Sequence, residues 1–506
     1  MTSRVQPRKP LLARVPADFV RAVLKGHSGL GLAFAAAIYL VCLTGTVAVF
    51  AHEFQRWELA GQPRLEALSP DAAQKALEGA IAQAGEVEHA YITMPSAELA
   101  LARVSVEKSG VTQSFVADDS GRVVASGATP WTEFITRLHI NLHLPQSWGV
   151  FLVGLTGVAL LSSLISGLLA HPRIFRDAFH VRLGGSRRLQ EADLHNRLGV
   201  WAMPFHVIVS LTGALLGLTT IIVGVLGMAL FQGDVGKVYA LFIPQAPKDD
   251  PRPAPMLDLR PMFAQVAVQA KGAPVNLVLL EHPTEVGGAA LFYTENDNGR
   301  LSNSDSYAFS RDGKLYHSAK AANGNTGQKV LNSLGKLHFG WFGGGLVKIL
   351  YGTLGLTLTY LAAGGVIIWL ARRRDKRNPA PGFERLWSAT IWGQPAALGL
   401  VALAAILAGA SGTKALLVTV WCIATLLSLA LAIRVAPEVI ARWLKLAAGA
   451  LLIGTGATHA ALRPSGDPIA WTVDATLLTL GVVLVWLTRP RAAVAAESRG
   501  AQPAAG

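Results

Sequence analysis

The chain has 506 residues, of which 51% are hydrophobic and only 15% are charged, and its mean hydropathy is +0.39. This composition excludes an ordinary soluble enzyme and favours a polytopic α-helical membrane protein. The net charge of +13 would suggest nucleic-acid binding in a soluble protein. Here the basic residues cluster at the edges of apolar stretches, so we expect no nucleic-acid partner.

About eight stretches are long and apolar enough to cross a bilayer, which takes roughly 20 residues. The third stretch is longer than a bilayer requires, so we expect it to tilt or to extend beyond the lipid. In chain order the stretches are residues 29–50, 148–170, 198–231, 346–371, 388–410, 414–433, 443–462 and 471–487.

Lysine and arginine gather in three segments beside these stretches, namely residues 1–26, 172–194 and 372–387. By the positive-inside rule we expect these segments and both termini to be cytoplasmic, in a bacterial inner membrane. The segments around residues 51–147 and 232–345 then lie on the periplasmic side. The lipid bilayer is thus one expected partner, and residues 489–506 are predicted to form a disordered tail.

Both periplasmic segments predict the same small α+β module. Ser69, Pro70 and Gly85 frame a helix in the first module, and residues 257–272 have a helical pattern in the second. About four strand-like runs follow each helix. The order of span, module and span therefore occurs twice, and duplicated membrane units commonly build a site on a pseudo-symmetry axis. The predicted repeats are residues 27–171 and 195–371, with an appended four-helix bundle at 388–488.

Four histidines occupy equivalent places in the two repeats. His27 and His195 open the first and third stretches, each at the same distance before a Leu-Thr-Gly triplet, whereas His139 and His338 open the second and fourth. If the four stretches form one bundle, one pair can meet near each membrane face. Facing imidazoles on neighbouring helices can bind a haem iron from both sides. The pattern thus predicts two haems in series, an arrangement that carries electrons.

Two further histidines leave the choice of ligands open. His143 lies four residues after His139, which would place it one turn along the same helix face, so it can replace His139. His206 lies eleven residues after His195, which is about 16 Å deeper on nearly the same face of a continuous helix. It can be the inner ligand itself, or a group near a haem propionate or a quinol.

Other cofactor chemistries find little support in the sequence. Four histidines that converge from both membrane faces cannot bind a single zinc ion. The chain has no CxxC, HExxH or Walker motif and no convincing GxGxxG, so we expect no flavin or nicotinamide domain. An electron donor must therefore bind from elsewhere.

The order of these motifs resembles the PepSY-associated transmembrane helix family over roughly residues 20–375. HSGLGL and LHNRLG open the first and third stretches, LHINLH and LHFGWFGG precede the second and fourth, and LTG lies in each odd stretch. Within that family the chain is similar to iron-regulated inner-membrane proteins that include ferric-siderophore reductases. The resemblance implies a polytopic protein with two PepSY-like periplasmic modules.

The same resemblance implies an activity and its ligands. The protein would be a haem-dependent ferric-chelate reductase with two haem b groups, which reduces ferric siderophore from Fe³⁺ to Fe²⁺ on the periplasmic side. A cytoplasmic reductase or a quinol would supply the electrons. His27 and His195 would be the inner axial ligands of haem iron, and His139 and His338 the outer ones.

Two other classes of function compete with this expectation. One is a siderophore or haem transporter whose repeats rock about a central path. The other is a PepSY-type sensor or anchor without redox activity. Haem retained through purification favours the reductase, uptake of the intact chelate favours the transporter, and a colourless protein that tolerates loss of His27 or His338 favours the sensor.

Overall fold

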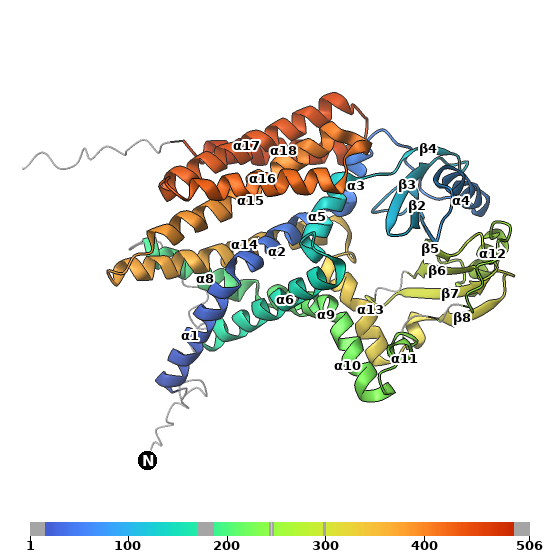
Figure 1. Cartoon of the computed structure of the whole chain (residues 1–506), viewed down its shortest axis with the longest axis horizontal. Coiled ribbons are helices and arrows are strands. Elements are labelled where there is room, and N and C mark those ends of the chain that lie inside the picture. The colour runs from blue at the N-terminus through green and yellow to red at the C-terminus, as the bar shows by residue number, and fades with distance from the viewer. Residues whose placement is uncertain (1–15, 171–186, 242–243, 245–246, 297–299, 490–506) are drawn as a thin grey trace, which may run out of the picture.

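The structure is a computed structural model of the whole chain (Figure 1). It describes residues 16–170, 187–241, 244, 247–296 and 300–489. The predicted disordered tail lies almost wholly outside the described residues. So do much of the basic N-terminal segment and most of the basic segment predicted at 172–194.

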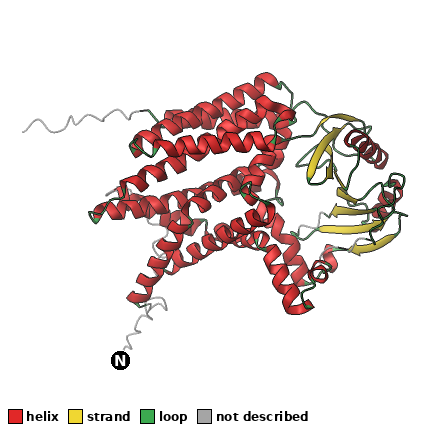
Figure 2. Cartoon of the chain, viewed as in Figure 1, coloured by secondary structure: helices red, strands yellow, loops and turns green. Residues whose placement is uncertain are grey.

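Long helices form a bundle, and a single sheet lies at one end of it (Figures 1 and 2). Among the described residues, six helices are long and apolar enough to cross a membrane, or eight if each of two bent helix pairs counts as one span. The chain is therefore a multi-pass membrane protein, as its hydropathy predicts. The six helices are α6 (Gln146–Leu169), α14 (Gly344–Asp375), α15 (Pro381–Ala408), α16 (Lys414–Leu431), α17 (Pro437–Leu462) and α18 (Pro468–Trp486).

The first and third predicted stretches are bent rather than straight. Helices α1 (Ala17–Ala33) and α2 (Ala35–Ala48) meet at 68°, and α8 (Arg187–Trp201) and α9 (Met203–Gly217) meet at 72°. Instead of tilting as one helix, the long third stretch breaks into α8, α9 and α10 (Thr219–Phe231). A proline in the first turn of α9 fits the second break, because proline lacks the N–H that would continue α8.

The two repeats interlock. In addition to the bent pairs, each contributes a short helix and a long one: α5 (Pro130–Asn141) with α6, and α13 (Thr326–Phe339) with α14. Helix α2 packs on α14 of the other repeat, and α9 packs on α6 in the same way. A helix of each repeat therefore packs against a helix of the other. This packing brings residues far apart in the sequence together inside the bundle.

The two modules merge into one sheet. Each has one helix and four strands, as predicted, but β1 and β5 pair in antiparallel register, for example Ile92 with Val278, to give the order β4-β3-β2-β1-β5-β6-β7-β8. Helices α4 and α12 cover the sheet's apolar face. The first module comprises α4 (Pro70–Ala84), β1 (His89–Thr93), β2 (Ala102–Lys108), β3 (Val111–Ala117) and β4 (Val123–Ser126). The second comprises α12 (Arg260–Gln269), β5 (Val275–Glu281), β6 (Ala289–Glu295), β7 (Ser304–Ser310) and β8 (Leu315–Ala319).

The appended bundle α15–α18 braces the first repeat. A shared apolar core joins Trp57 of α3 (Ala51–Glu58) and Trp131 of α5 to residues such as Leu398 and Leu417 of the appended bundle. Helix α5 has six buried residues, whereas its counterpart α13, every residue of which is described, has none. The repeats are thus similar in backbone but differ in their surroundings.

Buried polar groups reinforce this brace. Asp474 of α18 accepts a hydrogen bond from Trp57 Nε1 at 2.8 Å, and its other oxygen lies 2.9 Å from His459 Nδ1. The Nε2 atom of His459 in turn lies 2.8 Å from the Trp57 carbonyl oxygen. Arg56 pairs with Asp467 nearby, and all of these side chains are buried. Since each group has a partner, the cost of burying it is offset only while the bundle stays docked.

Glu58 links the appended bundle and α3 to α5, and its ionisation should make the stability of the fold depend on pH. Its buried carboxylate accepts bonds from the Trp131 and Thr132 amides and the Thr132 hydroxyl. Burial raises the pKa of Glu58 from 4.5 to about 7, against the opposing effect of these bonds. The folded state thus favours protonated Glu58, and this stabilisation is lost as the pH rises through about 7. We expect the wild-type melting temperature to fall between about pH 5 and pH 8 more steeply than that of Glu58→Gln. Thermal scans in detergent check this, and equal slopes would contradict it.

Candidate histidine pairs in the membrane bundle

One pair of histidines meets at the end of the bundle that carries the sheet, called here the sheet end. His139 of α5 and His338 of α13 have ring centroids 6.0 Å apart and ring planes 17° apart. The sequence predicted that these residues open the second and fourth spans, but both lie on separate short helices that precede the spans. Left-handed residues at the ends, Leu142 and Gly340, turn the chain from each short helix into the long one.

Hydrogen bonds fix the orientation of both rings. His139 Nδ1 lies 3.0 Å from the Val41 carbonyl oxygen, and His338 Nδ1 lies 3.0 Å from Thr212 Oγ1. The Thr212 hydroxyl donates to the Ile208 carbonyl, so it accepts from the histidine. Both Nδ1 atoms therefore carry the proton. Within the described residues neither Nε2 atom has a hydrogen-bond partner, which leaves its lone pair available for a metal.

The glycines of the two Leu-Thr-Gly triplets lie against these rings. A Cβ atom on Gly45 would lie 2.6 Å from Cε1 of His139, and a Cβ atom on Gly213 would lie 2.8 Å from Cε1 of His338. Both distances are shorter than any van der Waals contact allows. The triplets that drew attention to His27 and His195 therefore accommodate the other two histidines.

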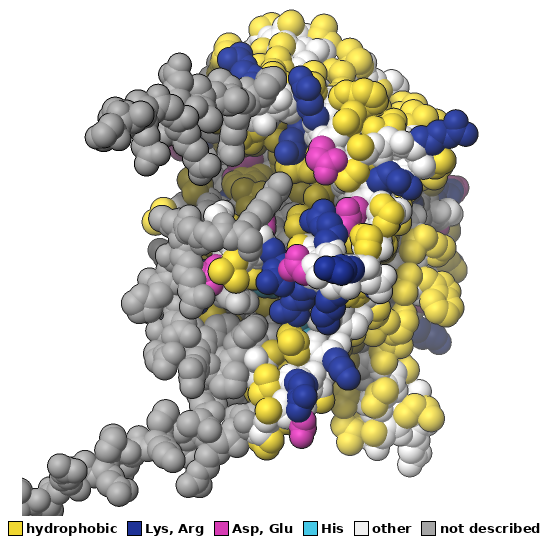
Figure 3. Space-filling view, turned by 90° about the vertical axis from the view of Figure 1, so that its left-hand side faces the viewer, with side chains coloured by type: hydrophobic (Ala, Val, Ile, Leu, Met, Phe, Trp, Pro, Cys, Tyr) yellow, Lys and Arg dark blue, Asp and Glu magenta, His cyan; other side chains and the backbone are white. Residues whose placement is uncertain are grey.

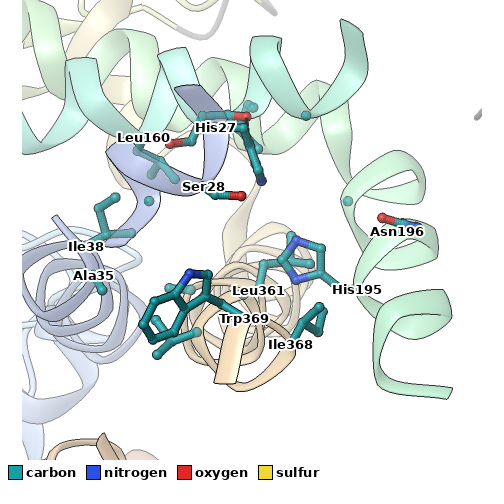
Figure 4. Close-up of a pocket in the computed structure, with 18 of the residues that line it drawn as sticks. His27, Ser28, Ala35, Ile38, Leu160, His195, Asn196, Leu361, Ile368 and Trp369 are labelled. Carbon is teal, nitrogen blue, oxygen red and sulfur yellow. Dashed lines mark hydrogen bonds between the residues drawn. The ribbon is translucent and has the colours of Figure 1, made fainter. Parts of the chain in front are cut away.

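The second pair lines a cavity at the opposite end. His27 from α1 and His195 from α8 project toward a cavity of about 230 Å³ (Figure 4). His27 Nδ1 lies 2.9 Å from the Ser163 carbonyl oxygen and 3.3 Å from Ser166 Oγ. Its Nε2 atom has no hydrogen-bond partner among the described residues. This ring is thus held in the same manner as His139.

The walls of this cavity suit a flat apolar group. Side chains such as Ile38, Leu361 and Trp369 line it, and Arg372 lies in its lining. The lining glycines Gly31 and Gly199 hold equivalent places in the two repeats and have open space where a side chain would be. Further glycines lie beside the rings of both His27 and His195. Glycine at such positions allows a planar ligand to approach the helix backbone closely.

His143 lies away from both pairs. Helix α5 ends at Asn141, and Leu142 and His143 both have left-handed backbones, with φ of 55° and 56°. The His143 ring folds back onto Phe134, with centroids 4.6 Å apart, and its Nε2 lies 3.0 Å from the Phe134 carbonyl oxygen. The prediction that His143 shares a helix face with His139 is therefore wrong, because the helix ends before it.

The helix break also separates His206 from His195. The 72° bend at Ala202 places them on different helices, so the prediction that both lie on one face is wrong. His206 is fully buried, and its Nε2 lies 3.1 Å from the Thr357 hydroxyl of α14. That hydroxyl donates to the Leu354 carbonyl, so Nε2 of His206 donates to it. His206 thus ties α9 to α14, and it is not in the lining of the cavity that His27 and His195 share.

The spacing of His139 and His338 can be compared with that of two histidines on one haem iron. Two metal–nitrogen bonds of about 2 Å and two ring radii of about 1 Å place the ring centroids about 6 Å apart. The 6.0 Å separation of His139 and His338 matches this arrangement. At the other end, His27 and His195 line one cavity with largely apolar walls and open glycine positions.

Comparison with known proteins gives two matches. The family model described as the PepSY-associated TM region matches residues 24–372. The matched region ends before α15 begins. A protein of Pseudomonas aeruginosa, itself uncharacterized, is 29% identical over 254 residues, or 48% of this chain. The match spans 64% of that relative's length.

Proposed function

Because this chain belongs to the PepSY-associated TM region family, we propose that it is a transmembrane electron-transfer protein in which two haem b groups serve the reduction of ferric siderophores. The observation that carries the proposal is the placement of one histidine pair at each end of a duplicated bundle. Three of these four rings have Nδ1 bonded to a carbonyl or hydroxyl oxygen, which suits an Nε2 ligand to iron.

The charge distribution supports an orientation for this protein. Lysine and arginine side chains gather over the end of the bundle opposite the sheet (Figure 3), here called the basic end. The last turn of α14 carries Arg372, Arg373 and Arg374, and Lys376 and Arg377 follow the helix directly. By the positive-inside rule the basic end faces the cytoplasm of a bacterial inner membrane. Electrons from a cytoplasmic reductase or a quinol would then enter beside His27 and His195 and leave at the sheet end.

The side chains around each pair have definable roles. A bound haem supplies one-electron chemistry at its iron. The hydrogen bonds at Nδ1 orient His27, His139 and His338. Gly45 and Gly213 make room for the imidazoles of His139 and His338. The apolar walls beside His27 and His195 would exclude water from a haem bound there. Arg372 in the inner lining can pair with a haem carboxylate. On the outer side, one electron converts chelated Fe³⁺ to Fe²⁺, which binds the hard oxygen ligands of a siderophore less tightly and is released.

Absorbance spectroscopy is the first test. The purified full-length protein is expected to show sharp α and β bands after dithionite reduction, with about two haems per chain by the pyridine assay. In liposomes that carry a reductant inside, it should reduce an external ferric siderophore, as detected with a ferrous chelator. A colourless protein after haem-supplemented expression would overturn the proposal and favour transport or sensing.

A single methyl group should disturb the outer pair. Gly45→Ala would force the His139 ring away, since the added Cβ lies 2.6 Å from Cε1. We expect one of the two haems to be lost, or to show a shifted absorbance spectrum and a shifted reduction potential. Gly29→Ala on α1 is the matched control, because nothing lies within 4 Å of its Cβ position. Redox-titrated spectra of both variants check this, and two unshifted haems in Gly45→Ala would contradict the role given to the triplet glycine.

A further inference from the structure

Three side chains of types that can bind metal ions converge on the sheet domain, far along the chain from the histidine pairs. One ligand atom from each of Asp249, His282 and Glu285 lies within 4.8 Å of the other two. His282 directly follows β5, whose last residue Glu281 pairs with His89 of β1. The cluster therefore lies at the end of the seam where the two modules join.

The backbone around the cluster is firmly held. The His282 amide donates to the Glu88 carbonyl at 2.7 Å, which ties the loop to the first module. Val286 and Gly287 donate to the carbonyls of Arg252 and Asp250, so the loop pairs with the segment that follows Asp249. Arg311 donates to the Glu285 carbonyl at 2.7 Å. Backbone hydrogen bonds thus hold His282, Glu285 and the segment that follows Asp249 independently of the three side chains, as a preformed site requires.

Two of these atoms face each other. His282 Nδ1 and Glu285 Oε2 lie 3.2 Å apart, within ion-pair distance. Both atoms are shielded from solvent, and among the described residues neither makes a bond of hydrogen-bond geometry. A separation near 3 Å is also what two ligands at right angles on one metal ion adopt, given bonds of about 2.1 Å.

The types of ligand select the class of ion. Carboxylate oxygens alone suit Mg²⁺ or Ca²⁺, whereas an imidazole together with carboxylates suits first-row transition ions such as Fe²⁺ and Zn²⁺. No cysteine lies in the cluster, which disfavours Cu⁺. We propose that Asp249, His282 and Glu285 form a binding site for a divalent first-row transition metal ion at the module seam. The site is independent of the proposed haem chemistry.

Calorimetry with the untagged, chelator-treated full-length protein in detergent tests the site with Zn²⁺ as the probe. We expect one Zn²⁺ per chain and at least tenfold weaker binding in His282→Asn and in Glu285→Gln. Asparagine suits position 282, because the backbone there is left-handed, with φ of 47°. Asp258→Asn is the matched control, since Asp258 is an acid of the same module that pairs with Arg260 instead. It should bind Zn²⁺ like the wild type.

Selectivity and stability complete the test. Zn²⁺ should raise the melting temperature of the wild type and of Asp258→Asn but not that of the two ligand variants, because only a specific site stabilises the folded state. If Ca²⁺ bound as tightly as Zn²⁺, the cluster would act as a non-selective acidic patch, and the proposal would be overturned. Equal Zn²⁺ affinity in the wild type and in Glu285→Gln would overturn it as well, even if His282→Asn fails to fold.

Discussion

Replacing His338 by alanine is expected to remove one of the two proposed haems and to abolish electron transfer to an external ferric chelate. His338 faces His139 at 6.0 Å between ring centroids, so its loss leaves a single imidazole for the outer iron. His27 and His195 line a separate cavity at the basic end, so the inner haem should remain. The same result is expected for His139→Ala, because the pair acts as a unit.

His143→Ala is the control for this experiment. His143 lies four residues after His139 but stacks on Phe134, so its loss should leave two haems and full activity. Haem counts, potentiometric titration and reduction of ferric siderophore in liposomes measure the effect. Two retained haems in His338→Ala, or loss of one in His143→Ala, would show that the outer ligands are assigned wrongly.

Asp474→Ala should undock the appended bundle from the first repeat. The substitution leaves buried Trp57 and His459 without the carboxylate that bonds to both. Each such orphaned group costs about 1–3 kcal/mol, so we expect the melting temperature to fall by roughly 5 °C or more. Because α3 and α5 pack against this bundle, the spectrum of the outer haem should broaden or shift while that of the inner haem stays unchanged.

Asp258→Asn serves again as control, since its side chain is half exposed and outside the membrane bundle. Thermal scans and low-temperature spectra of the purified variants are the measurements. A wild-type melting temperature in Asp474→Ala would mean that the buried network contributes nothing to docking. Lowered stability with an unshifted outer haem would instead confine the brace to a structural role, without influence on His139.

The appended bundle packs against the first repeat only, so the two histidine-bearing short helices have different surroundings. Helix α5, with His139, is covered by the appended bundle, whereas α13, with His338, exposes apolar residues such as Val330. The family match ends at residue 372, before the appended bundle begins. The outer pair therefore joins one histidine on a buried helix to one on a more exposed helix, a difference that the duplicated core alone does not contain.

The sequence by itself determined the class of the protein and its duplication. Hydropathy predicts which segments cross the bilayer, because the free energy of transfer from water to lipid is a property of each residue by itself. The helix and four strands of each module follow from the same local periodicities. Paired spacing also singled out His27 with His195 and His139 with His338 as candidate pairs, because equivalent positions in a repeat occupy equivalent places in space.

Only the tertiary structure decided which side chains meet. The bends near Phe34 and Ala202 lie within apolar runs, so hydropathy does not reveal them. The bend at Ala202 separates His206 from His195. The seam between β1 and β5 joins residues far apart in the chain, as does the contact of His459 with Trp57. Such contacts depend on how whole helices and strands pack, and no local preference of a residue specifies its distant partner.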